Sequence, residues 1–374
     1  MKRKSLLIVL LLVLSGVLAF WYWNKSKSNE DVIKIGVMLP LTGEGANWGN
    51  NAKMAIELAI DEIKTKNTKY KYEFIFEDSH TDSKTAISAF TKLVEIDRVK
   101  YCIVDMISSN VLAIAPIANK SKVIIISPGA SNPKITDAGD YVFRNWPSDA
   151  LQGKVDAIVA TDTFKWKKIA ILKINNDYGN GLSDVFIKNL KSGVSIVSNE
   201  SYEKGNTNFK TQILKIKESN PDGVYVLSYP EELPMIFKQC KELNLNKTLL
   251  GTETFESQQL IDNVGGLADG AIYTFPKSPD STMQIVKNFR ENYKRKFNKS
   301  WGTPGDAAYD AIFMFVNTIE QSGDDIDSVK RNLYGLKNYQ GASGVITIDK
   351  NGDAIKGFDV KVIKENKFIN FSNY

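Results

Sequence analysis

Residues 101–131, YCIVDMISSNVLAIAPIANKSKVIIISPGAS, contain the pattern that decides the fold class. Two short apolar runs, Tyr101–Asp105 and Val123–Ile126, flank an amphipathic segment at Val111–Asn119. A strand, a helix and a second strand in this order form a βαβ unit, whose parallel strands end at the same edge of a sheet. The stretch therefore predicts an α/β fold with a parallel sheet.

Hydroxyl-bearing and amide side chains follow both of these strands. Ser108, Ser109 and Asn110 come after the first run, and Ser127 and Ser131 come after the second. They should meet at one edge of the sheet, beside the N-terminus of a helix, where free N–H groups and small hydroxyls suit a carboxylate or another small anion. No base lies nearby to make the serines nucleophilic, so the pattern predicts binding of an anion rather than reaction with it.

Strand and helix patterns alternate through the rest of the chain. This alternation predicts mainly parallel sheets, and the length after the leader suits two domains rather than one core. The tail from Gly344 carries short β-patterns split by a turn at 350–352. Strands are expected at 33–39, 72–76, 141–144, 168–173, 195–198, 223–227, 248–251 and 271–275, and helices at 46–63, 83–96, 150–161, 179–190, 208–218, 231–243, 282–297 and 304–321.

Residues 1–30 are predicted to be a signal peptide or an N-terminal membrane anchor. Three basic residues precede an uncharged run from Ser5 to Trp23, and Ala19 would suit cleavage of a secretory signal. The aromatic residues 20–23, followed by Lys25 and Lys27, suit a retained anchor equally well. Both alternatives place the rest of the chain outside the cytoplasm, in the periplasm or at the outer face of the cell membrane.

The charge of the exported part argues against nucleic-acid binding. The 48 basic residues include five within the first 27 positions, so the remaining chain carries 43 basic residues against 43 acidic ones. A neutral surface provides no electrostatic attraction for nucleic acid. The two cysteines, Cys102 and Cys240, are expected to be buried free thiols, since free cysteine is usually buried; a disulfide between them has no support from their spacing.

The glycine-rich stretch Gly43–Gly49 weakly resembles a dinucleotide-binding motif. It follows a strand and opens a helix, but its third glycine stands one position late. A tight strand-to-helix corner explains the glycines equally well. Trp48 is an aromatic residue within this polar loop, and such a residue at the carboxyl edge of a strand often covers a ligand. We expect Trp48 to be a ligand wall, with packing under a loop as the alternative.

Other motifs give no support for an enzyme or a cofactor. His80 is the only histidine, and it lies in a polar stretch that suits a solvated residue. Glu231 and Glu232 fall at an expected helix start, where carboxylates favour the helix dipole. Asp349–Asp353 resembles the start of a calcium loop, but Val360 stands where a bidentate Glu would be required, so a hairpin turn is expected.

Three further polar features follow strands of the second half. They contain Tyr178, Tyr229 and Glu253, and ligands of open α/β sheets bind outside the carboxyl ends of strands. With the serines on the other side, they describe a pocket that has anion acceptors, one carboxylate and aromatic walls. An α-amino acid requires such groups for its carboxylate, its ammonium and its side chain.

The chain resembles the type I periplasmic binding proteins of the leucine/isoleucine/valine-binding family of ABC transporters, from about Ile33 to about Phe358. The order and spacing of the shared segments make the resemblance specific to this family. These segments are IKIGVMLPLTGEGANWGNNAKMAIE, FEDSHTDSKTAI, SSNVLAIAPIA, IIISPGASNPKIT, YVFRNWPSDALQG, NNDYGNG and GTPGDAAYDAI.

The resemblance implies a set of ligand contacts. Ser108 and Ser131 would hold the ligand carboxylate, with Ser109 beside them and the Gly129 backbone taking part, and Glu253 would bind the ammonium. The aromatic walls would be Trp48, Tyr178 and Tyr229. The disulfide of the family cannot form, because its positions read Ser79 and Ile107, and the usual lipoprotein cysteine is absent.

The resemblance also implies the architecture and the mechanism. Two Rossmann-like lobes would be joined by three crossovers near 147–149, 276–278 and 343–345. The N-lobe would comprise residues 33–147 and 277–343, and the C-lobe residues 148–276 and 344–374. The lobes would close over the ligand by a hinge motion, and a monomer would then be recognised by an ABC permease.

The sequence hypothesis is therefore an extracytoplasmic receptor that binds an apolar or branched-chain α-amino acid for an ABC importer. One alternative is a ligand-sensing domain that partners a separate receptor. Another is a binder of an amide, urea or a purine-like solute. An enzyme would have to turn over its ligand, and no group of residues suggests such a reaction.

Overall fold

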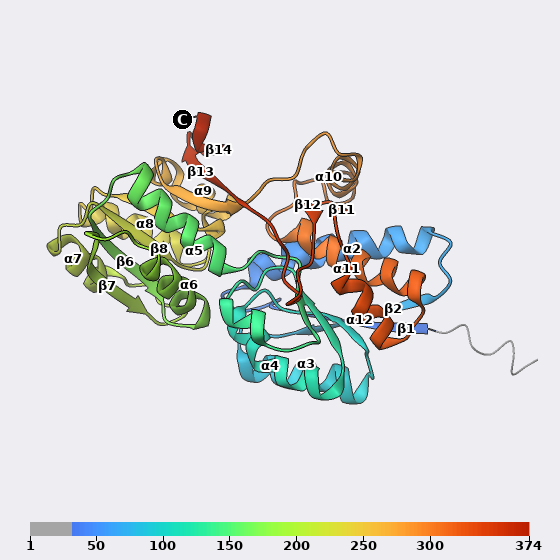
Figure 1. The fold of residues 1–374 in the computed structure, drawn as a ribbon. Helices are drawn as coiled ribbons and strands as arrows, with labels where there is room; N and C mark the ends of the chain where they lie inside the picture. The colour runs from blue at the N-terminus through green and yellow to red at the C-terminus, as the bar shows by residue number, and fades with distance from the viewer. Residues whose placement is uncertain (1–31, 374) are drawn as a thin grey trace, which may run out of the picture.

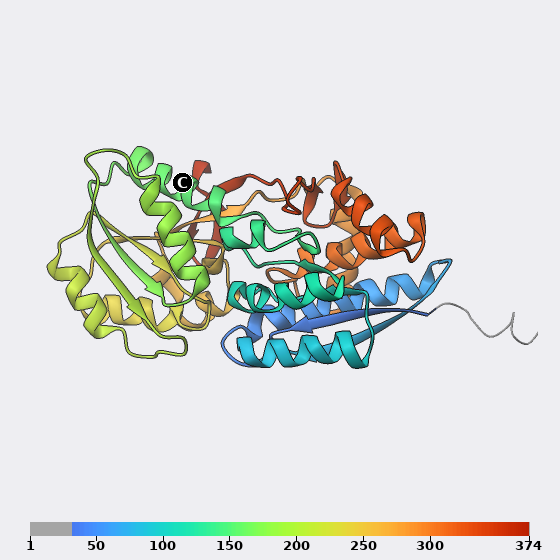
Figure 2. The same ribbon diagram turned by 60° about the horizontal axis from the view of Figure 1, so that its bottom comes forward.

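The computed structural model describes residues 32–373, which form two lobes that lie side by side (Figure 1). Each lobe contains a mainly parallel sheet with helices packed against it, as the second view also shows (Figure 2). The two-lobed α/β fold predicted from the sequence is confirmed. The expected leader at residues 1–30 lies outside the described residues.

The first lobe is built on a five-stranded parallel sheet with the order β2-β1-β3-β4-β5. Alternate residues along β1 and β3 face opposite sides, as the pleat requires. Ile35 and Ile103 enter the core on one face, while Met38 and Cys102 enter the core on the other. The strands are β1 (Val32–Leu39), β2 (Lys71–Asp78), β3 (Tyr101–Ile103), β4 (Ile124–Ser127) and β5 (Val142–Arg144).

Helices from both ends of the chain cover this sheet. One core includes residues of α2 (Ala46–Thr65), α10 (Gln284–Phe297), α11 (Gly305–Ser322) and α12 (Ile326–Tyr334). The other core includes residues of α3 (Ser83–Thr91) and α4 (Ser108–Ser121). Segments more than 200 residues apart in sequence therefore share one core.

The second lobe is built on a seven-stranded sheet with the order β14-β13-β10-β9-β8-β6-β7. Only β13 and β14 add antiparallel pairs, and the other neighbours are parallel. The strands are β6 (Lys168–Ile174), β7 (Ser195–Tyr202), β8 (Gly223–Leu227), β9 (Thr248–Gly251), β10 (Ile272–Pro276), β13 (Phe358–Lys364) and β14 (Lys367–Asn370). The helices are α5 (Asp149–Ile158), α6 (Asp177–Lys188), α7 (Lys210–Glu218), α8 (Leu233–Glu242) and α9 (Gln258–Val264).

The third crossover between the lobes lies later than expected. The sequence predicts this crossover at 343–345. However, β11 (Tyr339–Gly341) pairs with β12 (Gly344–Ile346). The core of the first lobe also includes Ile346, Ile348 and Ala354. The chain joins the second sheet only at β13, so residues 355–357 make the crossover and residues 344–354 belong with the first lobe. A buried ion pair between Arg144 and Asp353, with Nε–Oδ1 at 2.7 Å, anchors this segment.

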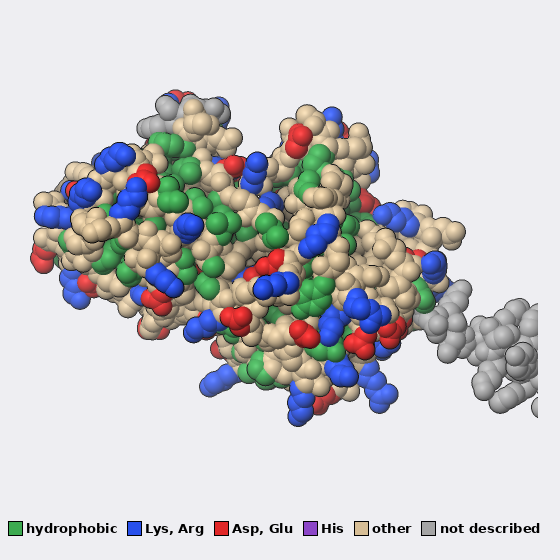
Figure 3. Space-filling view, viewed as in Figure 1, with side chains coloured by type: hydrophobic (Ala, Val, Ile, Leu, Met, Phe, Trp, Pro, Cys, Tyr) green, Lys and Arg blue, Asp and Glu red, His purple; other side chains and the backbone are tan. Residues whose placement is uncertain are grey.

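Several smaller expectations can be compared with the described residues. Cys102 and Cys240 are both buried and unpaired, as expected. The Asp349–Asp353 segment is a turn, in which the Asp349 carboxylate accepts hydrogen bonds from two backbone N–H groups. Between residues 32 and 373, we find no helix with the length and apolar character of a membrane span. Figure 3 shows basic and acidic side chains interspersed over one face of the molecule.

Candidate ligand-binding site

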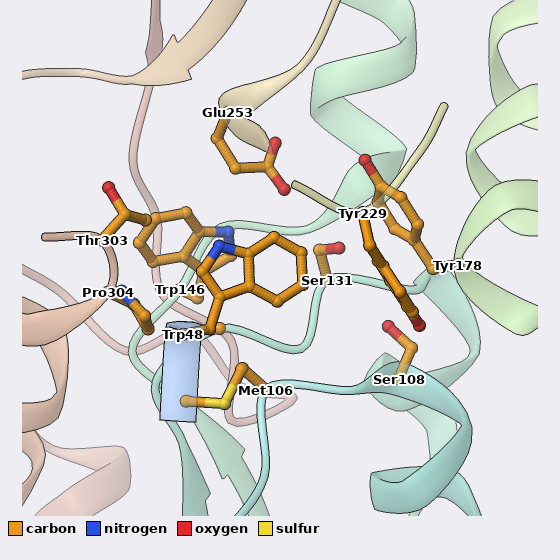
Figure 4. Close-up of a pocket in the computed structure, with 11 residues that line it drawn as sticks. Trp48, Met106, Ser108, Ser131, Trp146, Tyr178, Tyr229, Glu253, Thr303 and Pro304 are labelled. Atoms are coloured by element: carbon orange, nitrogen blue, oxygen red, sulfur yellow. The ribbon is translucent and has the colours of Figure 1, made fainter. Parts of the chain in front are cut away.

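A pocket lies between the two lobes at the carboxyl ends of their parallel strands (Figure 4). Its empty volume, which includes space open to solvent, is about 370 Å³. It is lined by Trp48, Met106, Ser108, Gly129, Ser131, Trp146, Tyr178, Tyr229, Glu253, Thr303 and Pro304.

The first lobe provides hydroxyl groups beside the start of α4. Ser108 is the first residue of this helix, which begins without a side-chain cap, and its hydroxyl accepts a hydrogen bond from the Asn132 backbone at 3.2 Å. Ser131 follows β4 and lies in the same pocket. Hydroxyl groups beside a helix N-terminus can donate hydrogen bonds to an anion, and the helix dipole favours a negative charge there.

A buried carboxylate organises the loop that carries Ser108. Asp105 accepts hydrogen bonds from the Ser79 hydroxyl, from the Ile107 backbone at 2.7 Å and from the Asn110 side chain at 2.8 Å. The Ser127 hydroxyl donates to the Asp105 carbonyl at 2.6 Å, so the loops after β3 and β4 are joined. These bonds fix the positions of both loops before any ligand arrives.

Gly129 allows the same two loops to approach one another closely. A Cβ at this position would lie 2.5 Å from the Cβ of Met106. Any larger residue would push the loops apart and widen this side of the pocket. The glycine is thus required by the packing of the wall, whether or not its backbone contacts a ligand.

Aromatic rings form the walls that join the two lobes. Trp48 of the first lobe meets Tyr229 of the second edge to face, with ring centroids 5.4 Å apart. Tyr178 stacks on Tyr229 with a centroid distance of 6.1 Å. The hydroxyl of Tyr178 is hydrogen-bonded to that of Thr252 at 2.7 Å, and that of Tyr229 accepts from Asn176 at 2.8 Å. The rings are therefore held in fixed orientations.

Glu253 places one carboxylate in the pocket from the second lobe. It follows β9, is buried, and accepts a hydrogen bond from Gln152 of α5 at 2.7 Å. Burial raises the pKa of Glu253 above its usual range, and the Gln152 hydrogen bond counteracts part of that rise. A cation placed beside this carboxylate would stabilise its charged form.

Contacts across the cleft show that the two lobes meet around this pocket. The Lys204 ammonium donates to the Thr81 carbonyl at 2.8 Å and lies 3.5 Å from the Glu44 carboxylate. The Asn132 side chain also donates to the Asp177 carbonyl. The geometry is therefore that of a closed pair of lobes, in which each lobe supplies part of the cavity lining.

Seven of the eight predicted site residues line this pocket: Trp48, Ser108, Gly129, Ser131, Tyr178, Tyr229 and Glu253. Ser109 does not. Its hydroxyl instead accepts a weak hydrogen bond from the Asp177 backbone across the cleft, at 3.4 Å. Consecutive helical residues point about 100° apart, so Ser108 and Ser109 cannot both face the same cavity.

Four lining residues were not predicted. Met106 precedes Ser108 in the same loop, and Trp146 follows β5, so the rule that ligands bind at the carboxyl ends of strands could have identified both. Thr303 and Pro304 lie between α10 and α11, far along the chain. No local pattern in the sequence indicates that they reach the pocket.

Glu231 and Glu232 do not have the helix-capping role that the sequence predicts for them. Helix α8 begins at Leu233, and Glu232 makes no side-chain cap to it; Glu232 accepts instead from the backbones of Tyr229 at 3.1 Å and Gly205 at 3.2 Å. Burial raises the pKa of Glu231 to about 8 and that of Glu232 to about 7. Both residues belong to the packing beside the cleft rather than to an exposed helix end.

The remaining chemistry of the site is that of binding. His80 lies on the surface, its Nδ1 is 2.7 Å from the Thr42 hydroxyl, and it is not among the residues that line the pocket. Among residues 32–373, no group of three or more His, Cys, Asp or Glu side chains could hold a metal ion. The pocket offers hydroxyls, one carboxylate and apolar walls, which can together bind a small zwitterion.

Comparisons with known proteins agree with this geometry. The family described as periplasmic binding protein matches residues 32–366. The leucine-specific-binding protein of Salmonella typhimurium is 30% identical over 284 residues, which cover 75% of both chains.

Solved structures share the fold over most of the chain. A leucine binding protein from Thermotoga maritima is 28% identical, has a TM-score of 0.84, and is matched over 91% of this chain and all of its own. A solute binding protein of an ABC transporter from R. palustris, solved with benzoate, has the same TM-score at 18% identity, over 91% of this chain and 95% of its own. At that identity the second similarity concerns the fold alone.

Proposed function

The chain belongs to the periplasmic binding protein family, and from this membership we propose that it is the exported receptor of an ABC importer for an apolar or branched-chain α-amino acid. One observation carries the proposal. The same pocket contains the hydroxyls of Ser108 and Ser131 and, on another wall, the carboxylate of Glu253 (Figure 4). An α-amino acid carries the two opposite charges that these groups would bind.

The residues then take separate roles. Ser108 and Ser131 donate hydrogen bonds to the ligand carboxylate, which also gains from the N-terminus of α4. Glu253 accepts from the ammonium in a site shielded from water, where a charge-assisted hydrogen bond is strong. Trp48 and Tyr229 close over the ligand from opposite lobes, as expected for binding by hinge closure.

The rest of the lining indicates the character of the ligand side chain. Met106, Trp146 and Pro304 add apolar surface to that of Trp48. An apolar side chain gains free energy in proportion to the surface that it removes from water. The leucine-specific relative, the leucine binding protein and the sequence resemblance all favour a branched-chain ligand.

An aromatic carboxylate is the second candidate, since the neighbour from R. palustris was solved with benzoate. The aromatic walls would accept a benzene ring. However, such a ligand brings no positive charge to Glu253, which would remain buried without a cation. The carboxylate in the pocket therefore favours an amino acid over an aromatic acid, and likewise over a neutral amide, urea or purine.

The test is thermal unfolding of the chain from Ser28 onward, which includes every described residue, in the presence of each candidate ligand. The panel contains the twenty amino acids, benzoate, 4-hydroxybenzoate, urea, short amides and purines. A ligand at one hundred times its dissociation constant stabilises by about 2.7 kcal/mol, which is measurable as a shift in melting temperature. We expect a shift confined to a few apolar amino acids.

A shift with an aromatic acid, amide or purine, and with no amino acid, would keep the fold and overturn the proposed ligand. A role in sensing is separated from transport by the genetic neighbourhood. Genes for permease and ATPase subunits next to this one are expected for a transport receptor, whereas a neighbouring kinase or chemoreceptor gene would favour a sensor.

A further inference from the structure

Asp149 is a fully buried acid for which the contacts described so far give no role. It is the first residue of α5, and neither of its carboxylate oxygens makes a hydrogen bond of good geometry within the described structure. The other deeply buried aspartates differ. Asp156 accepts from Tyr225 at 2.5 Å and from Thr274 at 2.6 Å, and Asp310 accepts from the backbones of residues 342 and 343.

The position of Asp149 connects two lining residues of the pocket. Its backbone N–H donates to the Ser131 carbonyl at 2.8 Å. Gln152 lies one turn further along α5, on the same helix face, and donates to Glu253 at 2.7 Å. Helix α5 therefore holds the Asp149 carboxyl group behind the wall formed by Ser131 and Glu253, without itself lining the cavity.

The charges around Asp149 are not balanced by the protein. Burial, followed by the nearby Glu253 carboxylate, raises the pKa of Asp149 well above its usual range, and the Ser131 hydroxyl offsets only part of the rise. The cation that also favours its charged form is Arg144, but this guanidinium already binds Asp353 at 2.7 and 2.8 Å. Two neighbouring buried carboxylates cannot both ionise readily without a cation.

A helix-capping role does not explain this acid. An acidic residue in the first turn favours the helix dipole, but α5 is already capped by Ser148, whose hydroxyl accepts from the Ala150 backbone. An exposed carboxylate would serve the dipole without the cost of burial, which is large for an unpaired charge. The buried Asp149 carboxyl group therefore costs free energy in the empty protein, and a cation that enters beside Glu253 would offset this cost.

We propose that Asp149 is a second carboxylate of the ammonium subsite, which acts from behind Ser131 and Glu253 to make the pocket select ligands that carry an amine. This inference rests on the proposed function and deepens it. Asp149 is a positioning residue, because it adds negative charge to the subsite without lining the pocket. It makes the site discriminate an α-amino acid from the same molecule without its amino group.

The first experiment compares Asp149→Asn with the wild type, using the amino acid identified by the ligand panel and its deaminated analogue. For leucine this pair is L-leucine and 4-methylpentanoate. We expect the affinity for the amino acid to fall about tenfold or more, since a charge in a buried site acts over several ångströms. The affinity for the deaminated analogue should stay equal or rise, and the ligand-free melting temperature should stay equal or rise because an unpaired buried acid is removed.

Asp310→Asn is the control, since it removes a buried, hydrogen-bonded acid of the first lobe, which accepts from the backbones of residues 342 and 343. It should leave the selectivity between the two ligands unchanged. If Asp149→Asn also leaves that selectivity unchanged, or lowers both affinities equally, the inference is wrong although the proposed function stands. A wild type that binds no amino acid contradicts the proposed function itself.

A second measurement needs no variant. If Asp149 and Glu253 share a proton in the empty protein, an incoming ammonium displaces it to solvent. Calorimetric titration of the wild type at pH 7 in two buffers of different ionisation enthalpy should then show proton release with the amino acid and none with its deaminated analogue. Equal heats in both buffers for the amino acid would contradict the inference.

Discussion

At the scale of single residues, the pocket contains both hydrogen-bond donors and a hydrogen-bond acceptor for its ligand. Ser108 and Ser131 offer hydroxyl donors, whereas Glu253 offers a buried acceptor with a raised pKa. Each group is satisfied only in part by the protein, because each faces the cavity. A polar group without a hydrogen-bond partner costs free energy, and a ligand that supplies the partner removes this cost on binding. A single substitution in the pocket should therefore change the affinity for the ligand more than the stability of the protein.

Glu253→Gln removes the negative charge and keeps the size of the side chain. We expect the affinity for the amino acid to fall by about 2 kcal/mol or more, since one partner of a buried charge pair is lost. The melting temperature without ligand should not fall, because a buried negative charge without a neighbouring cation is removed. Isothermal titration calorimetry and thermal unfolding check the two parts.

Glu218→Gln is the matched control for this change, because Glu218 is an exposed acid of the same lobe at the end of α7. It should alter neither affinity nor stability. Unchanged affinity in Glu253→Gln would remove the basis for assigning the ammonium to this residue.

At the scale of helices and strands, the carboxyl ends of parallel strands bring together residues that are distant in sequence. Hydrogen bonds then fix the loops, as Asp105 does for the loops after β3 and β4. The helices keep their expected extents with local changes. The helix expected at 83–96 consists of α3 followed by a π-helical turn at Lys92–Ile96, and the helix expected at 150–161 ends in a similar turn at Val159–Thr163.

The corner between β1 and α2 depends on close packing at Gly49. A Cβ at this position would lie 1.9 Å from the carbonyl oxygen of Pro40, which is fixed backbone. Gly49→Ala should therefore destabilise the first lobe by about 1–3 kcal/mol. Urea unfolding would report this as a lower midpoint.

Gly266→Ala serves as the control, because a Cβ there would meet open space. Its midpoint should match that of the wild type. An unchanged midpoint in Gly49→Ala would show that the corner can rearrange, and that its glycines are not required for packing.

At the scale of the whole molecule, burial of acids in both lobes links stability to pH. Burial raises the pKa of Asp105 to about 6, of Asp310 to about 7 and of Asp156 to about 8. Burial also raises the pKa values of Glu231 and Glu232, which lie beside the contact between the lobes. The folded protein therefore binds more protons than the unfolded chain between the unfolded and folded pKa values.

The ligand-free protein should become less stable as the pH rises from about 5 to about 8. By pH 5 the unfolded chain has already lost most of these carboxyl protons, whereas the folded protein still holds them, so a rising pH favours unfolding. Below the unfolded pKa values both states are protonated, and the effect vanishes. Melting temperatures across this range check the direction.

Asp156→Asn should flatten this dependence, since it removes one of the groups with a strongly raised pKa. A melting temperature that rises between pH 5 and pH 8 would contradict the expected sign.

The sequence alone determined the alternation of strands and helices, the two-lobed parallel architecture, and most of the residues that line the pocket. Hydrophobic periodicity is local, so it indicated the alternation, and parallel strands present their carboxyl ends at a common edge, which indicated the site residues. The two-lobed arrangement followed from the resemblance to a known family. Ser108, Ser131, Tyr178, Tyr229 and Glu253 were all found from their places after strands.

Only the tertiary structure decided which side chains reach the same space. Ser109 turns away because one helical step rotates a side chain out of the pocket, and Thr303 reaches the pocket from a distant loop. The third crossover lies later in the chain than predicted, because the Arg144–Asp353 ion pair holds the segment around Asp353 against the first lobe. Likewise, Asp149 is buried beside Ser131, whose carbonyl accepts from its backbone N–H, and no local pattern of residues records contacts that the fold makes between distant segments.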